Sequence, residues 1–244
     1  MKSSTGSKIA LIALALVTAA TAGVAAAPRA AGSGDASPGS TSHMLDAIEP
    51  APLSQAEEES IIFMREEEKL ARDVYLALYD LWQINVFGNI ARSEQQHMDA
   101  MLSLVERYDL ADPALTPGQF SDPELQALYD TLIERGSESA EEALRVGALI
   151  EEVDIEDLAR DVELADNEDI ALIYGNLLAA SENHLRAFAG QIERFYGEYE
   201  PVVLSEDHYE SIMESRTSGP AEGRGAPADR GRAPRGRAPL GRRG

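Results

Sequence analysis

The sequence predicts an all-α fold, a four-helix bundle whose second and third helices are joined by a long crossover that carries a short extra helix. Apolar residues recur at intervals of three and four across residues 54–215, and no segment there alternates as a strand would. Proline and glycine cluster within residues 113–123, where the crossover is expected. Capping-box pairs precede two long helical stretches: Ser54 with Glu57, and Ser139 with Glu142.

The first two helices are expected to form a hairpin. The first begins at Ser54 and continues to about Trp82. A short connection over residues 83–86 leads into the second helix, which continues to Tyr108. A connection this short predicts that the two helices are antiparallel neighbours.

The crossover and the second hairpin follow. The crossover helix is expected to begin at about Ser121, with Ser121 and Glu124 as its cap. The third helix is expected over residues 139–162 and the fourth over residues 167–196. A final short helix is expected over residues 205–215.

Each long helix carries a polar residue inside its apolar stripe. In the second helix, steps of three and four place Glu94 and His97 on an otherwise apolar face. The same test places Glu68 on the inner face of the first helix, Glu151 on that of the third and His184 on that of the fourth. A buried carboxylate without a cation costs several kcal/mol, so five ligand-type residues converging from four helices predict a metal site.

A second explanation of this pattern needs no metal. Buried glutamates can pair with arginines and only specify how the helices associate. Arg72, Arg145 and Arg186 are available for such pairs, and Arg186 is also expected to hold a ligand carboxylate in place. On this pattern, Glu152 and Glu182 are expected to point outward.

Two tyrosines share the inner faces. Tyr75 and Tyr174 are expected to be core residues whose hydroxyls lie near a polar site, and the alternative is a role as hydrogen-bond donors to the metal ligands or as radical relays.

The absence of cysteine narrows the chemistry. Disulfides, thiolate catalysis, zinc–thiolate sites and iron–sulfur clusters are all excluded. A site of carboxylates and imidazoles suits iron, with two ions expected, or manganese. The sequence contains no nucleotide-binding loop, no hydrolase nucleophile with a paired base, and no haem or flavin motif.

Several motifs resemble a known family. "EKLARDVY" and "EQQH" are similar to the first half of a ferritin or rubrerythrin bundle. More closely, "EEEKLARDVY", "NIARSEQQHMDAM", "ALRVGALIEEVDIEDL" and "NLLAASENHLRAF" together resemble the ferritin-like family catalogued as domain of unknown function 2202, over about residues 54–197. The resemblance implies a ferritin-like bundle with a carboxylate-bridged di-iron or related centre. The ligands that it implies are Glu68, Glu94, His97, Glu151 and His184.

The sequence departs from the ferritin-like pattern in its fourth helix. A di-iron bundle of this class has two lone glutamates and two E-x-x-H pairs. Here Ser181 stands three residues before His184, where the second glutamate is expected. Asp154, one turn after Glu151, is a candidate for the missing carboxylate, and an asymmetric site with an open position is the alternative.

The register of the first hairpin raises a second question. Counted outward from the connection, Asp73 lies level with Glu94 and His97, whereas Glu68 lies more than one turn deeper at about 1.5 Å per residue. Asp73 is therefore an alternative to Glu68. In the expected centre, Glu94 and His97 bind the ions, Glu68 and Glu151 bridge or cap them, and His184 completes the far side.

The ends of the chain have a different composition from residues 54–215, the expected helical domain. Residues 1–27 combine two lysines with an uncharged run, which predicts a secretory signal and an exported protein, in the periplasm, at the cell surface or outside the cell. A retained membrane anchor is the alternative. Residues 28–53 are expected to be a disordered linker, and residues 216–244 a disordered tail rich in arginine, glycine and proline.

Charge is distributed unevenly. Residues 54–216 contain 38 acidic and 11 basic residues, whereas the tail from residue 217 carries a net charge of +5. The acidic domain argues against a nucleic-acid partner. The basic tail suggests contact with a cell surface or an anionic polymer. The sequence is compatible with a homo-oligomer.

Three functions fit these observations. The first is an exported two-metal oxidoreductase that consumes oxygen or peroxide, and the second is a metal-binding or iron-scavenging protein without turnover. The third is a structural or interaction bundle with a polar core and no metal.

Overall fold

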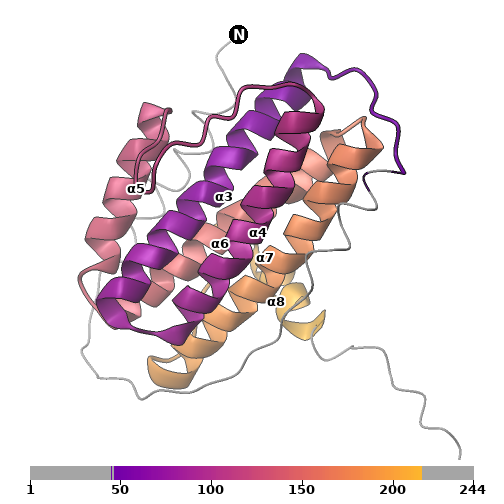
Figure 1. The fold of residues 1–244 in the computed structure, drawn as a ribbon. Coiled ribbons are helices and arrows are strands. Elements are labelled where there is room, and N and C mark those ends of the chain that lie inside the picture. Colours follow the sequence, from indigo (N-terminus) through magenta and orange to yellow (C-terminus); the bar gives the residue numbers. More distant parts are fainter. Residues whose placement is uncertain (1–44, 46, 216–244) are drawn as a thin grey trace, which may run out of the picture.

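The computed structural model describes residue 45 and residues 47–215, and every regular element among them is a helix. Two shorter helices, α5 (Pro123–Gly136) and α8 (Glu206–Ser215), accompany four long ones that lie side by side as a bundle (Figure 1). The long helices are α3 (Gln55–Trp82), α4 (Asn85–Arg107), α6 (Ala140–Leu164) and α7 (Glu168–Phe195). The prediction of an all-helical fold is therefore confirmed. Packing is most extensive between α3 and α4 and between α6 and α7, so the bundle consists of two hairpins.

The ends of the chain lie largely outside the described residues. This applies to the predicted signal (1–27), to the predicted tail (216–244) and to most of the predicted linker. In the rest of the linker, Leu45 and Leu53 pack against the bundle, so packed residues begin before residue 54. None of the described helices combines the length and the apolar character needed to cross a membrane.

The start of α3 is fastened to the second hairpin. Ser54 and Glu57 form the predicted capping box, in which the Ser54 N–H donates to Glu57 Oε2 at 2.9 Å and the Glu57 N–H donates to Ser54 Oγ at 3.2 Å. Glu57 Oε1 also accepts the backbone N–H groups of Asp166 and Asn167, at 3.1 and 3.0 Å. One carboxylate therefore caps α3 and holds the turn before α7.

The cap of the crossover helix lies one residue later than predicted. Asp122, not Ser121, accepts the N–H groups of Glu124 and Leu125. Pro123 occupies the first helical turn, where its fixed φ suits a helix start, and this sets the cap at the residue before it. The N–H and the hydroxyl of Ser121 instead donate to a glutamate of α3, Glu66 Oε1, at 3.0 and 2.8 Å.

The same crossover is fastened to α3 by a buried lysine. Lys69 is fully buried, and its Nζ lies 2.6 Å from Asp73 Oδ2, 2.9 Å from the Gln119 carbonyl oxygen and 4.0 Å from the centre of the Phe120 ring. The N–H of Gly118, a residue with a φ of 75° that favours glycine, donates to the same Asp73 oxygen at 2.9 Å. The long connection is thus a closely held part of the fold.

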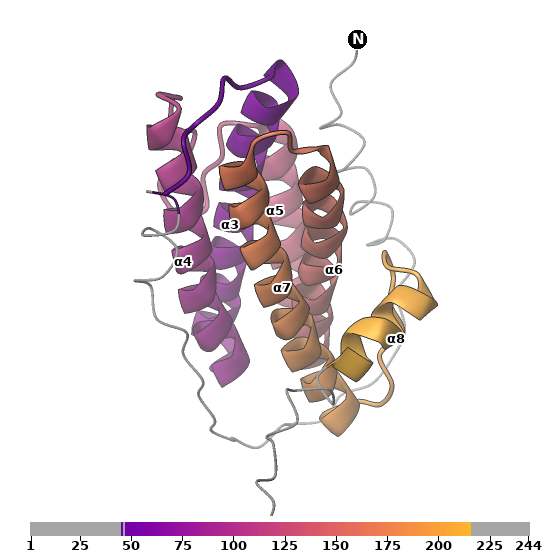
Figure 2. The ribbon, with the colours of Figure 1, turned by 90° about the vertical axis from the view of Figure 1, so that its right-hand side faces the viewer.

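The segment that ends in α8 folds back over the second hairpin (Figure 2). Glu152 accepts a short hydrogen bond from the Tyr199 hydroxyl. It also accepts the backbone N–H groups of residues 202–204, and the shortest of these N–H contacts is 2.7 Å. The prediction that Glu152 points outward is therefore wrong, because this segment covers it and leaves it with no exposed surface.

Arg186 also belongs to the contact with α8. Its Nε donates to the Ile212 carbonyl oxygen at 2.7 Å, and its Nη2 lies 2.5 Å from Ser215 Oγ and 3.1 Å from Glu182 Oε2. The prediction that Arg186 holds a ligand carboxylate is therefore wrong, since α8 occupies the guanidinium. The Glu182 side chain keeps 30% of its surface exposed, in line with its predicted outward position.

The buried apolar residues form two clusters along the bundle. One contains Phe87 and Phe188, and the other contains Met64 and Met101. Along α3, buried apolar residues of the second cluster end at Met64, and those of the first begin at Leu70. The buried residues of α3 between these two positions are charged, so a polar layer separates the two clusters.

Candidate metal centre

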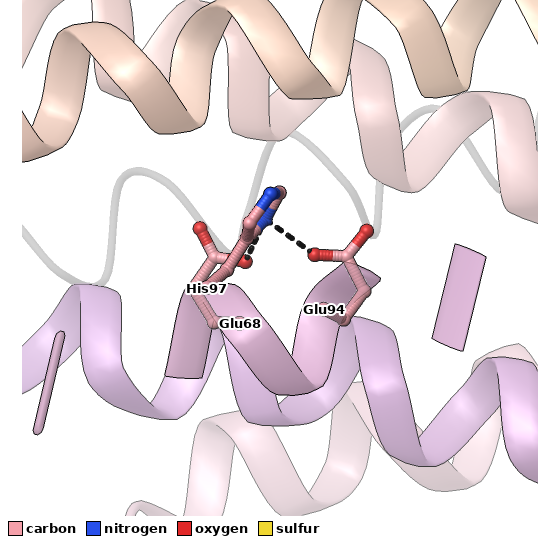
Figure 3. A group of neighbouring side chains, drawn as sticks. All are labelled: Glu68, Glu94 and His97. Carbon is pink, nitrogen blue, oxygen red and sulfur yellow. Dashed lines mark hydrogen bonds and ion pairs between the residues drawn. The ribbon is translucent and has the colours of Figure 1, made fainter. Parts of the chain in front are cut away.

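The five predicted ligands lie in this polar layer, and all are buried. Their exposed fractions are 1% for Glu68, 2% for Glu94, 7% for His97, 1% for Glu151 and 7% for His184. Figure 3 shows Glu68 of α3 beside Glu94 and His97 of α4, with the imidazole between the two carboxylates.

The five side chains form two overlapping groups of three. Glu68, Glu94 and His97 offer donor atoms that all lie within 4.8 Å of one another, and so do Glu94, Glu151 and His184. The first group lies entirely on the α3–α4 hairpin, whereas the second joins that hairpin to α6 and α7. Glu94 is the residue that the two groups share.

The two histidines face opposite oxygens of Glu94. His97 Nδ1 lies 2.8 Å from Glu94 Oε2, and His184 Nδ1 lies 2.8 Å from Glu94 Oε1. His97 Nδ1 is also 3.1 Å from Glu68 Oε2, and His184 Nδ1 is 3.4 Å from Glu151 Oε2. The two rings stack with their centres 5.4 Å apart. The shared, central carboxylate is therefore Glu94, whereas the sequence pointed to Glu68 and Glu151 as the bridging or capping residues.

Burial and the charges of neighbouring side chains shift the pKa values of these groups in opposite directions. Burial raises the pKa of Glu68 to about 8, against the effect of His97. Burial also acts to raise the pKa of Glu94, but His97 and His184 outweigh it and hold that pKa below its ordinary value. Burial acts to lower the pKa of His184, but the charges of Glu94 and Glu151 outweigh it and raise the pKa to about 9. Among the five residues, these shifts therefore favour the protonated form of the imidazoles.

Comparison with known proteins places the chain in a family. Residues 57–216 match the family described as "Uncharacterized protein domain (DUF2202)". The chain belongs to the DUF2202 family.

Two comparisons extend this assignment. An uncharacterized protein of Methanocaldococcus jannaschii, MJ0754, is 46% identical over 175 residues, which cover 71% of this chain and 95% of that protein. The crystal structure of hypothetical protein MJ0754 from Methanococcus jannaschii matches with a TM-score of 0.67 and covers 69% of this chain and 97% of that one. Both matches therefore cover almost the full length of the MJ0754 chain.

Some donor atoms of the five residues have no hydrogen-bond partner in the described part of this DUF2202 domain. Glu68 Oε1, Glu94 Oε1 and His184 Nδ1 are buried and have no hydrogen-bond partner among the described residues. Glu94 Oε1 and His184 Nδ1 are only 2.8 Å apart, so what they lack is the alignment of a hydrogen bond. Such donors suit a cation between them.

Arginine pairing does not explain the three buried glutamates of the candidate centre, Glu68, Glu94 and Glu151. Within the described part of the chain, no lysine or arginine forms an ion pair with any of the five residues. Arg72 pairs with Asp73, Arg145 with Glu141, and Arg186 with Glu182. Oxygen and imidazole donors without a basic side chain are a ligand set that iron and manganese accept.

Asp73 lies outside the centre, so it does not replace Glu68. Arg72 lies opposite Gln95, with 2.7 Å between Nη1 and Oε1, and this contact defines the register of the hairpin. Relative to that register, Glu68 and His97 are offset by two residues, or about 3 Å along the helix. Their long side chains span this offset, because Glu68 Oε2 and His97 Nδ1 meet at 3.1 Å.

Asp154 and Ser181 lie next to the centre of the DUF2202 domain. Asp154 belongs to neither group of three, and its Oδ2 accepts a short hydrogen bond from Ser181 Oγ. Ser181, at the position where the sequence pattern leads one to expect a second glutamate, therefore forms a hydrogen-bonded pair with Asp154 between α6 and α7.

The two tyrosines have different surroundings. The Tyr75 hydroxyl donates to Glu151 Oε1 at 2.6 Å and so orients a residue of the second group. The Tyr174 hydroxyl lies 2.9 Å from Ser60 Oγ, which itself donates to Asp161 at 2.6 Å. Tyr75 therefore contacts the candidate centre directly, whereas Tyr174 belongs to a separate hydrogen-bond network.

Proposed function

We propose that this DUF2202 protein binds two divalent metal ions in the core of its helical bundle. Glu68, His97 and Glu94 hold one ion, and Glu94, Glu151 and His184 hold the other. The observation that carries the proposal is the pair of overlapping, buried groups that share Glu94. Both imidazoles present Nδ1 to this shared carboxylate, so each bound ion would take one nitrogen and carboxylate oxygens.

Iron is the first choice for both ions, and manganese is the second. The site offers oxygen and imidazole donors, and the chain has no cysteine to supply a softer ligand. Three carboxylates carry a charge of −3 when ionised, which balances most of the charge of two divalent ions.

The ligand set is that of a ferritin-like centre with one glutamate replaced. Two metals joined by a carboxylate can share the electrons needed to reduce oxygen or peroxide, and we propose chemistry of this kind or iron handling for the protein. Tyr75 holds Glu151 in place, and the two apolar clusters on either side exclude bulk water from the layer. Oxygen and peroxide consumption by the ferrous protein distinguishes turnover from binding alone.

A second candidate is a structural bundle with a polar core and no metal. The raised pKa values of His97 and His184 favour it, because protonated imidazoles balance part of the carboxylate charge. Burial, which acts to lower both pKa values, is outweighed in each histidine by the carboxylates around it.

Metal analysis of protein purified without chelators separates the two candidates. We expect about two ions per chain in the wild type and their loss in Glu94→Ala, because Glu94 serves both groups. His97→Ala removes a ligand of the first group only. Glu106→Ala, which removes an exposed carboxylate from the same helix, is the control and should bind metal normally. A metal-free wild type whose stability does not change with chelator would favour the polar core.

We also propose that the protein is exported, on the composition of residues 1–27. N-terminal sequencing should then find a mature chain that begins between Val24 and Arg29. An intact Met1 on membrane-bound material would support the anchor instead.

A further inference from the structure

The two groups of the centre each have one glutamate of their own, and a hydrogen bond restricts one of these two residues. Glu151, of the second group, accepts the Tyr75 hydroxyl on its Oε1 at 2.6 Å. Its Oε2 lies 3.4 Å from His184 Nδ1, inside the group. Tyr75 therefore engages one oxygen of Glu151 and leaves the other for an ion.

Glu68, the corresponding residue of the first group, has no such restriction. Its Oε2 lies 3.1 Å from His97 Nδ1, and its Oε1 is buried without a hydrogen-bond partner in the described part of the molecule. Both oxygens of Glu68 are therefore available to the first ion.

The remaining donors are the same for both ions, because each ion would take one Glu94 oxygen and one histidine Nδ1. Glu68 brings the first position to as many as four protein donor atoms, whereas Glu151 brings the second to three. Iron and manganese commonly take about six ligands. Catalytic zinc sites, which also have three protein ligands, bind water or substrate at the position left open. The second position is therefore the more open of the two.

Charge and burial limit what the open position can bind. The three carboxylates carry −3 when ionised against +4 from two divalent ions, so the loaded centre keeps one positive charge. An unbalanced buried charge is costly, which favours one bound anion. Each of the five residues is at most 7% exposed, so the anion must be small.

We propose that the second position binds a small anion, such as azide or the anion of hydrogen peroxide, and that Tyr75 keeps this position open. Tyr75 does so by holding Glu151 Oε1, so it is a positioning residue that acts through a ligand. This inference rests on the proposed function, to which it adds the place and the chemical class of a co-reactant.

Azide titration of the Co²⁺-loaded full chain tests the proposal, because the visible absorption of Co²⁺ changes when its ligands change. We expect the wild type to bind one azide per pair of ions. Tyr75→Phe frees Glu151 Oε1 for the ion and closes the position. It should keep both ions and bind azide at least about tenfold more weakly.

Tyr174→Phe is the matched control. It removes a buried hydroxyl in the same way, but this hydroxyl lies against Ser60 and not against a residue of the centre. Tyr174→Phe should therefore keep both ions and the azide affinity of the wild type.

Variants that hold a single ion show which position binds azide. His97→Ala leaves the second group complete, and His184→Ala leaves the first group complete. We expect His97→Ala to bind azide and His184→Ala to bind it at least about tenfold more weakly. This comparison also tests the proposal if Tyr75→Phe does not fold, as checked by circular dichroism.

The outcomes separate this proposal from the proposed function. The inference is overturned, and the two-metal centre left intact, if the loaded wild type binds no azide or if Tyr75→Phe loses an ion. The same holds if Tyr75→Phe binds azide as the wild type does, or if azide prefers His184→Ala. A wild type that takes up no tightly bound Co²⁺ overturns the two-metal centre and this inference with it.

Discussion

Asp73 and Glu68 are buried acids on the same helix, little more than one turn apart, yet their surroundings differ in kind. Asp73 has Lys69 at 2.6 Å, Arg72 at 2.6 Å and the N–H of Gly118 at 2.9 Å. Glu68 contacts His97 at 3.1 Å and lies beside another carboxylate, Glu94, and one of its oxygens has no hydrogen-bond partner among the described residues.

This difference separates a structural charge from a candidate ligand. The partners around Asp73 satisfy it without any added group, and they connect α3 to the crossover. The partners around Glu68 converge on it from α4 without completing its hydrogen bonds. Burial alone therefore does not separate a structural charge from a candidate ligand, and the completeness of its pairing is the observation that does.

The largest expected effect on stability comes from a change beside Asp73, the acid whose partners are complete. Lys69→Met removes one of the two cations beside Asp73, leaving Arg72, and removes the bond to the Gln119 carbonyl oxygen of the crossover. We expect the free energy of unfolding to fall by about 3 kcal/mol, the lower end for a broken buried pair. Urea denaturation of the metal-free protein measures this loss. Arg92→Met, at an exposed arginine of α4, should change stability by less than about 0.5 kcal/mol.

Metal loading tests the candidate centre around Glu68, where the hydrogen bonds are incomplete. An ion held in excess at about 100 times its Kd should stabilise the wild type by about 2.7 kcal/mol, and Glu94→Ala should lose this gain. Lys69→Met should keep the same metal-induced gain on its lower baseline, because Lys69 contacts none of the five residues. Loss of metal binding in Lys69→Met would contradict the distinction between the surroundings of Asp73 and those of Glu68.

The pH dependence of the chelated protein gives a third, smaller effect. Glu94 and Glu151 raise the pKa of His184 to about 9 against the effect of burial, so the stability from its protonated form is complete below about pH 6.5 and is lost as pH rises through 9. Burial raises the pKa of Glu68 to about 8, which also makes stability fall as pH rises. We expect a loss on the order of 2 kcal/mol between pH 6.5 and 9. Thermal melts with chelator measure it, and stability that rises over this interval would contradict these assignments.

The smallest effect concerns Glu57, another carboxylate with a complete set of partners. Burial acts to raise its pKa, but the N–H and hydroxyl of Ser54 and the N–H groups of Asn167 and Asp166 outweigh it and lower the pKa. Its contribution is therefore present above about pH 4.5 and is lost as pH falls below that value. Glu57→Gln should cost about 1 kcal/mol at pH 7 and little in acid, as measured by urea denaturation. The exposed neighbour Glu58 provides the control variant, Glu58→Gln, which should behave as the wild type at both pH values.

Local patterns in the sequence were sufficient for much of this architecture. Ser54 and Ser139 each accept the predicted N–H of a helix start, and the interval of three and four placed the five polar residues in one buried layer. Such signals depend on neighbours within one or two turns, so they can be read along the chain.

The errors arose where distant segments decide the surroundings of a residue. Glu152 is buried by residues about 50 positions later in the chain, and Asp73 is engaged by a crossover glycine 45 positions later. Neither contact leaves a periodic signal in α6 or α3. The central position of Glu94 was missed for the same reason, since it depends on how the two hairpins dock.

The division of ligands between the hairpins has a consequence for how the protein matures. The first group is complete once residue 97 has been made, because Glu68, Glu94 and His97 all belong to α3 and α4. The second group needs residues from both hairpins and so exists only after they have docked. If the proposed centre holds two ions, we therefore expect them to be acquired in a fixed order as the chain folds, the first by a partly folded chain and the second as the last step of assembly.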